Sequence, residues 1–407
     1  MSMQDMTMAA PARTTPARTT ATRTTPARTG PGAAAMAGGL DDVVVARTAL
    51  SHVDGAGGQL TIAGMPLEAL ADRPLEAVAG RLWQAAAGAA ADGAPAAGLG
   101  AGRQAAWSQN ARALAAARGL PPMEGLIAAL AAIGPQDRVQ DGEQDGAQDG
   151  AAGAAAGPEA EACRLAGAVA VFLPALLRQA AGLTPVAPRP ELPHAADLLR
   201  MLRDAAPAPA EADALNRYLV TVSDHGMNAS TFTARVVAST RAGMSASVLA
   251  ALCALKGPLH GGAPGPVLDM LDAVAAQPDA RTWVRAQLAA GERIMGFGHR
   301  VYRVRDPRAD VLRAAAAGLQ SPRLAAAAAL EEAVLAELAA HRPGRRLETN
   351  VEYMTAILLD ALAMPREAFT ALFAAGRVVG WTAHVIEQER TGRLIRPQSD
   401  YAAPGGS

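Results

Sequence analysis

Residues 365–389 place apolar side chains at the spacing of a single helix face. These side chains are Phe369, Leu372, Phe373, Gly376, Val379, Ala383 and Ile386. A stripe with this period predicts a long helix that buries one face in a core. Residues 245–255 and 322–341 have the same character, and Pro258 ends the first of them because proline cannot continue the helical hydrogen-bond ladder. Alanine, the strongest helix former, recurs throughout while β-branched runs are scarce, so the sequence predicts an all-α protein.

Two low-complexity segments interrupt this helical pattern. Residues 1–39 contain an imperfect repeat of proline, threonine and arginine with few apolar residues, which predicts a disordered arm. This composition also resembles an organellar transit peptide, although a solvated arm is the preferred interpretation. Residues 136–157 are rich in glycine and aspartate and superficially resemble a calcium-binding loop. The twelfth position of that loop is Ala152 and not the glutamate that calcium requires, so we predict a flexible acidic loop. Between these segments, "QLTIAG" at residues 59–64 predicts a short strand.

Charge, cysteine content and hydropathy exclude several classes of protein. The 37 basic and 38 acidic residues nearly balance, which argues against a nucleic-acid partner. Cys163 and Cys253 lack metal-type spacing and predict buried thiols in a reducing compartment. The longest apolar run, residues 165–177, is too short to span a membrane and contains Pro174, so it predicts a core helix. No segment has the pattern of a secretory signal, and we expect a cytoplasmic protein without a membrane partner.

Polar residues gather in four patches in the second half of the chain. The patch "SDHGMNAST" contains Asp224, His225, Asn228 and Ser230. The patch "KGPLHGG" contains His260 and Lys256, which is the only lysine in the chain. Its glycines allow a ligand to approach the backbone closely.

The other two patches carry a cluster of arginines and an isolated acid. The patch "IMGFGHRVYRVRDPRAD" contains His299, followed by Arg300, Arg303, Arg305 and Arg308. Such a cationic loop suits a substrate with several carboxylates or phosphates. The patch "ETNVEYM" places Glu352 in otherwise apolar text.

The co-occurrence of these residues predicts proton-transfer chemistry. Histidine exchanges protons near neutral pH, and a desolvated carboxylate can act as a base. Each residue alone is more often structural, so the prediction depends on their occurring together. Arg377 lies beside the apolar stripe of residues 365–389 and needs an anion, supplied either by an acidic side chain or by a ligand. The sequence contains no phosphate-binding loop, dinucleotide fingerprint or metal-ligand pattern, so we expect no metal.

Taken in order, "GPLHGGA", "MGFGHRVYR" with "DPR", and "RPQSDY" resemble the citrate synthase family, which includes the bacterial 2-methylcitrate synthases. The resemblance implies an all-α homodimer in which a smaller helical domain is inserted into a larger one. It implies a large domain at residues 40–258, a small domain at 259–365, and a return to the large domain at 366–407. It also implies acetyl-CoA or propionyl-CoA and oxaloacetate as substrates, with no cofactor besides the CoA thioester.

The resemblance also assigns roles to individual residues. His260 is expected to stabilise the enol of the acyl-CoA, and His299 to polarise the carbonyl group of oxaloacetate. Glu352 stands where the family has the aspartate that removes the methyl proton. Four further residues match the family's oxaloacetate and citrate ligands: His225, Arg308, Arg377 and Arg396, the last reaching in from the other subunit. The expected CoA contacts are Lys256, Arg300 and Arg303, and for Lys256 a purely structural role is an equally open alternative.

Glu352 is the departure from the family pattern. Its extra methylene moves the carboxylate by about an ångström, a shift that can lower a rate about a hundredfold. Three explanations remain open: a compensating backbone shift in a working citrate synthase, a site remodelled for another acyl-CoA such as propionyl-CoA, or a non-catalytic binding or structural dimer. The sequence favours the working enzyme because the three histidines and the ligand arginines are all present.

Overall fold

The computed structural model describes residues 40, 43–91, 98–133, 157–261, 264–277, 279–299, 301–341, 344, 347–399 and 401. The chain divides into two compact units, residues 1–45 and residues 46–407, and the helices and strands of the described residues lie in the second. The predicted arm lies outside the described residues, as does almost all of the predicted acidic loop, residues 136–156.

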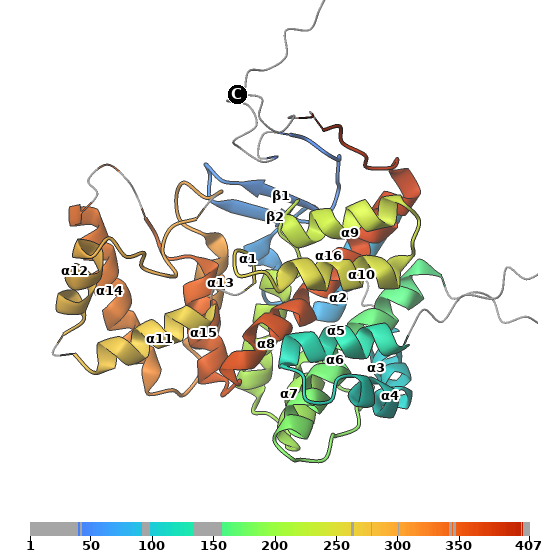
Figure 1. Ribbon diagram of the computed structural model, residues 1–407, viewed down its shortest axis with the longest axis horizontal. Helices are drawn as coiled ribbons and strands as arrows, with labels where there is room; N and C mark the ends of the chain where they lie inside the picture. The colour runs from blue at the N-terminus through green and yellow to red at the C-terminus, as the bar shows by residue number, and fades with distance from the viewer. Residues whose placement is uncertain are drawn as a thin grey trace, which may run out of the picture. The chain divides into compact units, whose positions relative to one another are not determined.

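Residues 46–407 are mostly helical, which confirms the predicted all-α class (Figure 1). The helices are α1 (Leu67–Leu70), α2 (Leu75–Ala87), α3 (Gly98–Ser108), α4 (Asn110–Ala116), α5 (Pro122–Ile133), α6 (Pro158–Ala180), α7 (His194–Arg203), α8 (Pro209–Val222), α9 (Ala229–Ser239), α10 (Met244–Leu255), α11 (Pro264–Ala275), α12 (Ala280–Ala289), α13 (Pro307–Ala316), α14 (Arg323–His341), α15 (Val351–Ala361), the 3₁₀ helix η2 (Arg366–Ala368) and α16 (Phe369–Thr391). The three helices expected from periodicity therefore form as α10, α14 and α16.

A small antiparallel sheet precedes the helices, in the order β1 (Ser51–Asp54), β2 (Gln59–Ile62) and β3 (Met65–Pro66). Strand β2 confirms the strand expected at residues 59–64. The turn between β1 and β2 lies against the loop that follows His299: the amide of Arg303 donates to the carbonyl oxygen of Gly55 at 2.8 Å. Gly55 is needed there, since a Cβ atom on it would lie 2.4 Å from the carbonyl oxygen of Val301.

Helices α6 and α16 form the centre of the core. Helix α16 packs against α2, α6, α8, α9 and α10, and Figure 1 shows it running among them. Pro158–Ala180 and Arg366–Thr391 are long and apolar enough to cross a membrane, but 83% and 89% of their apolar windows are buried inside the protein. Such burial is typical of core helices, as predicted for residues 165–177. Helices α3 and α6 cross closely where Gly102 meets Gly167, because a Cβ atom on Gly167 would lie 2.3 Å from the backbone of Gly102.

The two cysteines differ in exposure. Cys163 is buried in α6, as predicted. The prediction of a second buried thiol was wrong: Cys253 is exposed on α10. Ala251, Leu252 and Leu255 form the buried face of that helix, and Cys253 lies on the opposite face. The neighbouring residues are apolar on every side, so the sequence has no period from which the exposed face could be predicted.

Candidate active site

The polar patches of the sequence meet at the ends of helices within residues 46–407. His225 follows α8, His260 follows α10, and His299 precedes α13. The ring centroids of His225 and His299 are 5.8 Å apart, although 74 residues separate them along the chain. His260 lies 2.8 Å from the hydroxyl of Ser230, five residues after His225, and Arg377 of α16 donates to the carbonyl oxygen of Val222, three residues before His225. The predicted site is therefore assembled from four separate segments.

His299 is held as a neutral ring with a defined proton position. The backbone amides of Val301 and Tyr302 point at Nδ1, at 3.0 and 3.1 Å. Because Nδ1 accepts, the ring proton belongs on Nε2. Burial, followed by the charge of Arg308, lowers the pKa of His299 to about 4, so the ring is neutral at pH 7.

Arg308 converges on the same point from the start of α13. Its Nη2 atom lies 3.0 Å from Nε2 of His299. Asp306 fixes the guanidinium through two contacts, at 3.0 Å to Nε and 2.9 Å to Nη2. Asp306 also caps α13 and accepts the amide of Val351 at the start of α15. With the ring proton on Nε2, both nitrogens are donors, so their 3.0 Å approach is not a hydrogen bond. It is also too short for an atom to lie between them, and an acceptor oxygen beside the pair would receive both N–H groups.

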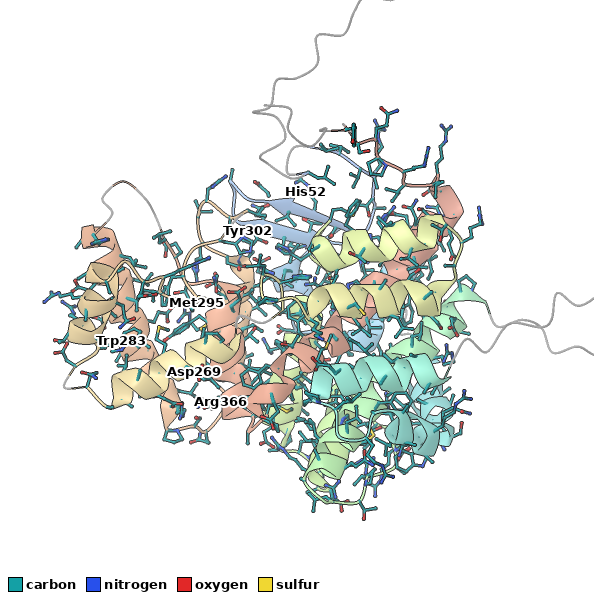
Figure 2. The ribbon with its side chains drawn as sticks, in the orientation of Figure 1. His52, Asp269, Trp283, Met295, Tyr302 and Arg366 are labelled. Carbon is teal, nitrogen blue, oxygen red and sulfur yellow. The ribbon has the colours of Figure 1, made fainter. Side chains whose placement is uncertain are left out.

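His225 and Tyr302 close another side of the site. Nε2 of His225 lies 3.2 Å from the hydroxyl oxygen of Tyr302, and Figure 2 labels Tyr302 in the loop beside the β1–β2 hairpin. Burial, then the charges of Arg308 and Arg377, holds the pKa of His225 well below its usual value. The ring is thus a neutral hydrogen-bonding group at pH 7.

His260 has the opposite tautomer from His299. The amide of Ser230 donates to Nε2 of His260 at 3.3 Å, and the Ser230 hydroxyl lies 2.8 Å from the same atom. The proton therefore belongs on Nδ1. Trp381 donates to the Ser230 hydroxyl at 3.1 Å and fixes it in turn. Burial, followed by the charge of Arg377, lowers the pKa of His260 to about 4.

Glu352 occupies the first turn of α15. Asn350 caps this helix by accepting from the amides of Glu352 and Tyr353, at 3.0 and 3.3 Å. Burial raises the pKa of the Glu352 carboxyl group, and the charges of Arg308 and Arg293 offset only part of that rise. A half-buried carboxylate with a raised pKa is suited to accepting a proton near neutral pH.

Arg377 is buried on α16 with its outer nitrogens available to a ligand. Its Nε atom donates to the carbonyl oxygen of Val222 at 2.5 Å, and its guanidinium lies 4.7 Å from the centre of the Phe373 ring. Burial lowers its pKa to about 10, and Asp224 opposes that shift. Among the described residues no carboxylate forms an ion pair with Arg377. The anion that this position was expected to need is therefore left to a ligand.

No hydrogen bond or ion pair joins the described side chains of Lys256, Arg303 or Arg396 to this cluster. Lys256 pairs with Glu124 at 3.0 Å and is half exposed. Arg303 and Arg396 are exposed, and Arg300 lies outside the described residues. Arg305, from the same cationic loop, pairs with Asp310. The CoA and cross-subunit roles of these residues stay predictions.

Three residues of the site were not singled out by the sequence reasoning. Tyr302, Trp381 and Asn350 act through hydrogen bonds to His225, to Ser230 and to the helix of Glu352. Only Asn350 carried a usable signal, since asparagine before a helical run is typical of an N-cap.

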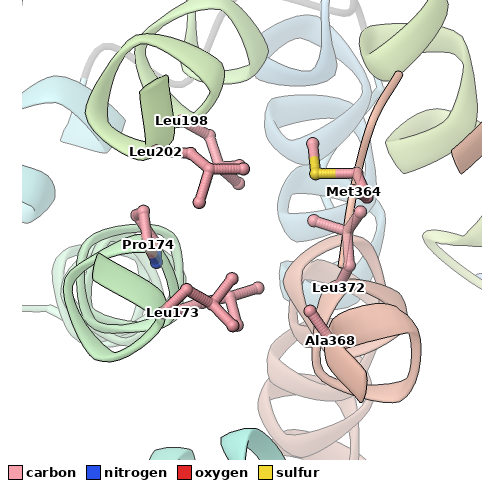
Figure 3. A pocket seen from close by; sticks show the side chains of 8 residues that line it. Leu173, Pro174, Leu198, Leu202, Met364, Ala368 and Leu372 are labelled. Atoms are coloured by element: carbon pink, nitrogen blue, oxygen red, sulfur yellow. The ribbon is translucent and has the colours of Figure 1, made fainter. Parts of the chain in front are cut away.

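The described residues contain no group of three or more His, Cys, Asp or Glu side chains that could hold a metal ion. A separate cavity lies between α6, α7 and the start of α16, lined only by apolar side chains such as Leu173, Leu198 and Leu372 (Figure 3). It offers no polar group for chemistry.

Comparison with known proteins agrees with this geometry. The family described as "Citrate synthase, C-terminal domain" matches residues 39–398. The chain belongs to the citrate synthase family. It is 52% identical over 199 residues to "Putative citrate synthase 2" of Mycobacterium tuberculosis, a match that spans 49% of this chain and about half (53%) of that relative.

Two further matches span nearly the whole chain. The citrate synthase of Deinococcus radiodurans is 33% identical over 376 residues, which cover 90% of this chain and 95% of that protein. The solved citrate synthase of Thermoplasma acidophilum, in a ternary complex with carboxymethyl coenzyme A and oxaloacetate, superimposes with a TM-score of 0.77 at 27% identity, covering 91% of this chain and 96% of that one.

Proposed function

We propose that the protein condenses acetyl-CoA with oxaloacetate and hydrolyses the resulting citryl-CoA to citrate and CoA. The observation that carries this proposal is the convergence of His299, Arg308 and His225 on one point, with Arg377 close by. Fixed N–H donors around a single point suit a dicarboxylate whose central carbonyl group must be polarised.

Each group has a part in the reaction. The Glu352 carboxylate removes a proton from the methyl carbon of the thioester, and Nδ1–H of His260 donates to the thioester oxygen as negative charge develops there. Nε2–H of His299 donates to the carbonyl oxygen of oxaloacetate and then supplies the proton for the new alkoxide. Attack of the enol carbon on that carbonyl group forms the carbon–carbon bond, and water then cleaves the thioester to release CoA.

The binding roles follow the same division. Arg308, Arg377 and His225 hold the carboxylates of oxaloacetate, and Arg396 of a second copy completes the grip in a homodimer. The exposure of Arg396 on the C-terminal segment supports a role outside its own subunit. CoA contacts are assigned to Lys256, Arg300 and Arg303, and no cofactor is needed besides the thioester.

The test is release of CoA thiol, followed with a thiol-reactive dye, from the purified protein with oxaloacetate and either acetyl-CoA or propionyl-CoA. Oxaloacetate-dependent release that is lost in His260→Ala supports the synthase. Faster release from propionyl-CoA makes it a 2-methylcitrate synthase. Both thioesters are tested because one methylene in an apolar pocket is worth only about 1–3 kcal/mol of discrimination. Absence of thiol release while oxaloacetate still raises the Tm would instead identify a non-catalytic binding dimer.

A further inference from the structure

A buried hydrogen-bond network adjoins the candidate active site and takes no part in the proposed chemistry. His384 and Asp224 are both fully buried, with Nε2 of His384 lying 3.2 and 3.3 Å from the two carboxylate oxygens of Asp224. On its other side, His384 accepts from Nη1 of Arg235 at 2.8 Å. Arg235 is paired in turn with Glu387, at 2.6 Å. Arg235 and Glu387 therefore compensate each other's charge, and the Asp224 carboxylate is stabilised by hydrogen bonds.

The contact with Arg235 orients the ring of His384. Guanidinium is always a donor, so Nδ1 of His384 is the acceptor. The ring proton therefore lies on Nε2 and points at Asp224. Burial alone would raise the pKa of Asp224, but His384 and the Ser51 hydroxyl, at 2.6 Å, outweigh burial and lower it. Asp224 is held as an anion.

Helix α16 grips the segment before His225 at three successive residues. Arg377 and His384 are seven residues apart, which is nearly two helical turns, so both side chains lie on one face of α16. Arg377 donates to Val222, and His384 donates to Asp224.

Between these two contacts, Gly380 allows the backbones to touch. A Cβ atom on Gly380 would lie 2.2 Å from the carbonyl oxygen of Ser223. The next residue after this gripped segment is His225. The position of the His225 ring therefore depends on the contacts that α16 makes with residues 222–224.

Asp224 also acts on Arg377 through its charge. It favours the charged form of that buried guanidinium without pairing with it. A direct ion pair would occupy the nitrogens of Arg377, whereas a nearby anion leaves them open to a ligand.

We propose that His384 is a positioning residue for oxaloacetate: by donating to Asp224 it fixes the turn that carries His225. The inference rests on the proposed function. His384 itself touches no substrate.

Two substitutions separate this role from simple packing. In His384→Gln the side-chain amide nitrogen takes the place of Nε2 and can still donate to Asp224. In His384→Asn the amide oxygen takes the place of Nδ1, so the contact with Arg235 survives while the donor to Asp224 is lost. Both variants shorten the same buried side chain and so serve as controls for each other.

We expect His384→Asn to raise the KM for oxaloacetate at least tenfold, with the KM for the acyl-CoA changed less than twofold. His384→Gln is expected to stay within about threefold of the wild type in both. Equal KM values for the two variants, or a parallel loss for both substrates, would overturn the proposal. If His384→Asn does not fold, Ser51→Ala removes the other donor to Asp224 and is expected to raise the KM for oxaloacetate selectively.

Binding of oxaloacetate, measured as the rise in Tm that it produces, distinguishes a failure of the role of His384 from a failure of the proposed function. If oxaloacetate raises the Tm of the wild type and of His384→Asn equally, only the role of His384 is contradicted. A wild-type protein with no response to oxaloacetate contradicts the proposed function and this inference with it.

Discussion

Asn350 donates its side-chain amide to the carbonyl oxygen of Gly298, at 2.8 Å. Its amide oxygen meanwhile caps helix α15, so one side chain joins the residue before His299 to the helix that begins next to Glu352. The proposed base and the proposed carbonyl-polarising group are thereby held at a fixed separation.

Asn350→Ser is expected to retain the helix cap but lose the bond to Gly298, because serine accepts as an N-cap but cannot reach that carbonyl. A loosened His299 loop should lower kcat by about tenfold to a hundredfold. Steady-state thiol release measures this, and Asp279→Ser at the N-cap of α12 controls for the capping change. A kcat within twofold of wild type would show that the link does not position the site.

Ser230→Ala removes the hydroxyl that lies against Nε2 of His260 but keeps the backbone donor. With the ring less firmly oriented, kcat should fall about threefold to tenfold, which corresponds to one ordinary hydrogen bond. Ser247→Ala, which removes a similarly buried hydroxyl from α10, should lower stability comparably without this effect on kcat. Equal kcat values in the two variants would contradict an orienting role.

Lys256→Gln tests whether the only lysine binds CoA. As half of an exposed ion pair it contributes less than about 1 kcal/mol to folding, so the Tm should change little. If the ammonium group contacts a CoA phosphate, Lys256→Gln raises the KM for acyl-CoA, whereas Glu124→Gln, which frees the lysine, lowers it or leaves it unchanged. Identical KM values in both variants would leave Lys256 with a structural role.

The acidic limb of the rate against pH should report Glu352. Its pKa is raised above 4.5 by burial, while those of His260 and His299 lie at about 4. As the pH falls, Glu352 is therefore protonated first, and kcat/KM for the acyl-CoA declines with a midpoint above pH 4.5. The profile is measured between pH 4 and 8, with circular dichroism to verify the fold. A midpoint at about pH 4 would assign the limb to the histidines instead.

His194 makes stability depend on pH far from the site. Burial, followed by the charge of Arg103, lowers its pKa to about 3, against 6.5 as the ordinary value. Between these values the unfolded chain binds a proton that the native protein does not, so this contribution is complete above pH 6.5 and is lost as the pH falls toward 3.

His194→Asn keeps an acceptor for Arg103 but cannot titrate. Its free energy of unfolding should fall less steeply from pH 6.5 to pH 4, by up to about 1.4 kcal/mol per pH unit. Urea unfolding at several pH values provides the measurement, and His52→Asn, on an exposed strand position, is the control. A slope equal to that of the wild type would show that His194 titrates normally.

The helices could be predicted because their signal is local. Periodic apolar residues marked α16, and the Gly257–Pro258 pair marked the end of α10. The burial of Cys163 but not Cys253 could not be predicted, since alanine-rich helices have no strongly apolar face and either side can be turned inward.

The sequence predicted the reactive side chains of the candidate site but not the hydrogen bonds that orient them. His225, His260, His299 and Arg308 stood out in their motifs. The tautomers of His260 and His299 depend on backbone amides of Ser230, Val301 and Tyr302, which every residue but proline possesses and no sequence pattern marks. The pairing of His384 with Asp224 joins positions 160 residues apart and follows from the packing of α16 against the end of α8.

The contact of Gly380 on α16 with residues 222–224 affects how variants of this protein should be interpreted. A Cβ atom on Gly380 would lie 2.2 Å from the carbonyl oxygen of Ser223, so main-chain atoms set the spacing there and no side-chain exchange at residues 222–224 can relax it. We expect a volume change on the buried face of α16 to shift this contact, and with it the turn that carries His225. Core variants of α16 are therefore expected to lose affinity for oxaloacetate, the proposed substrate, before they lose stability.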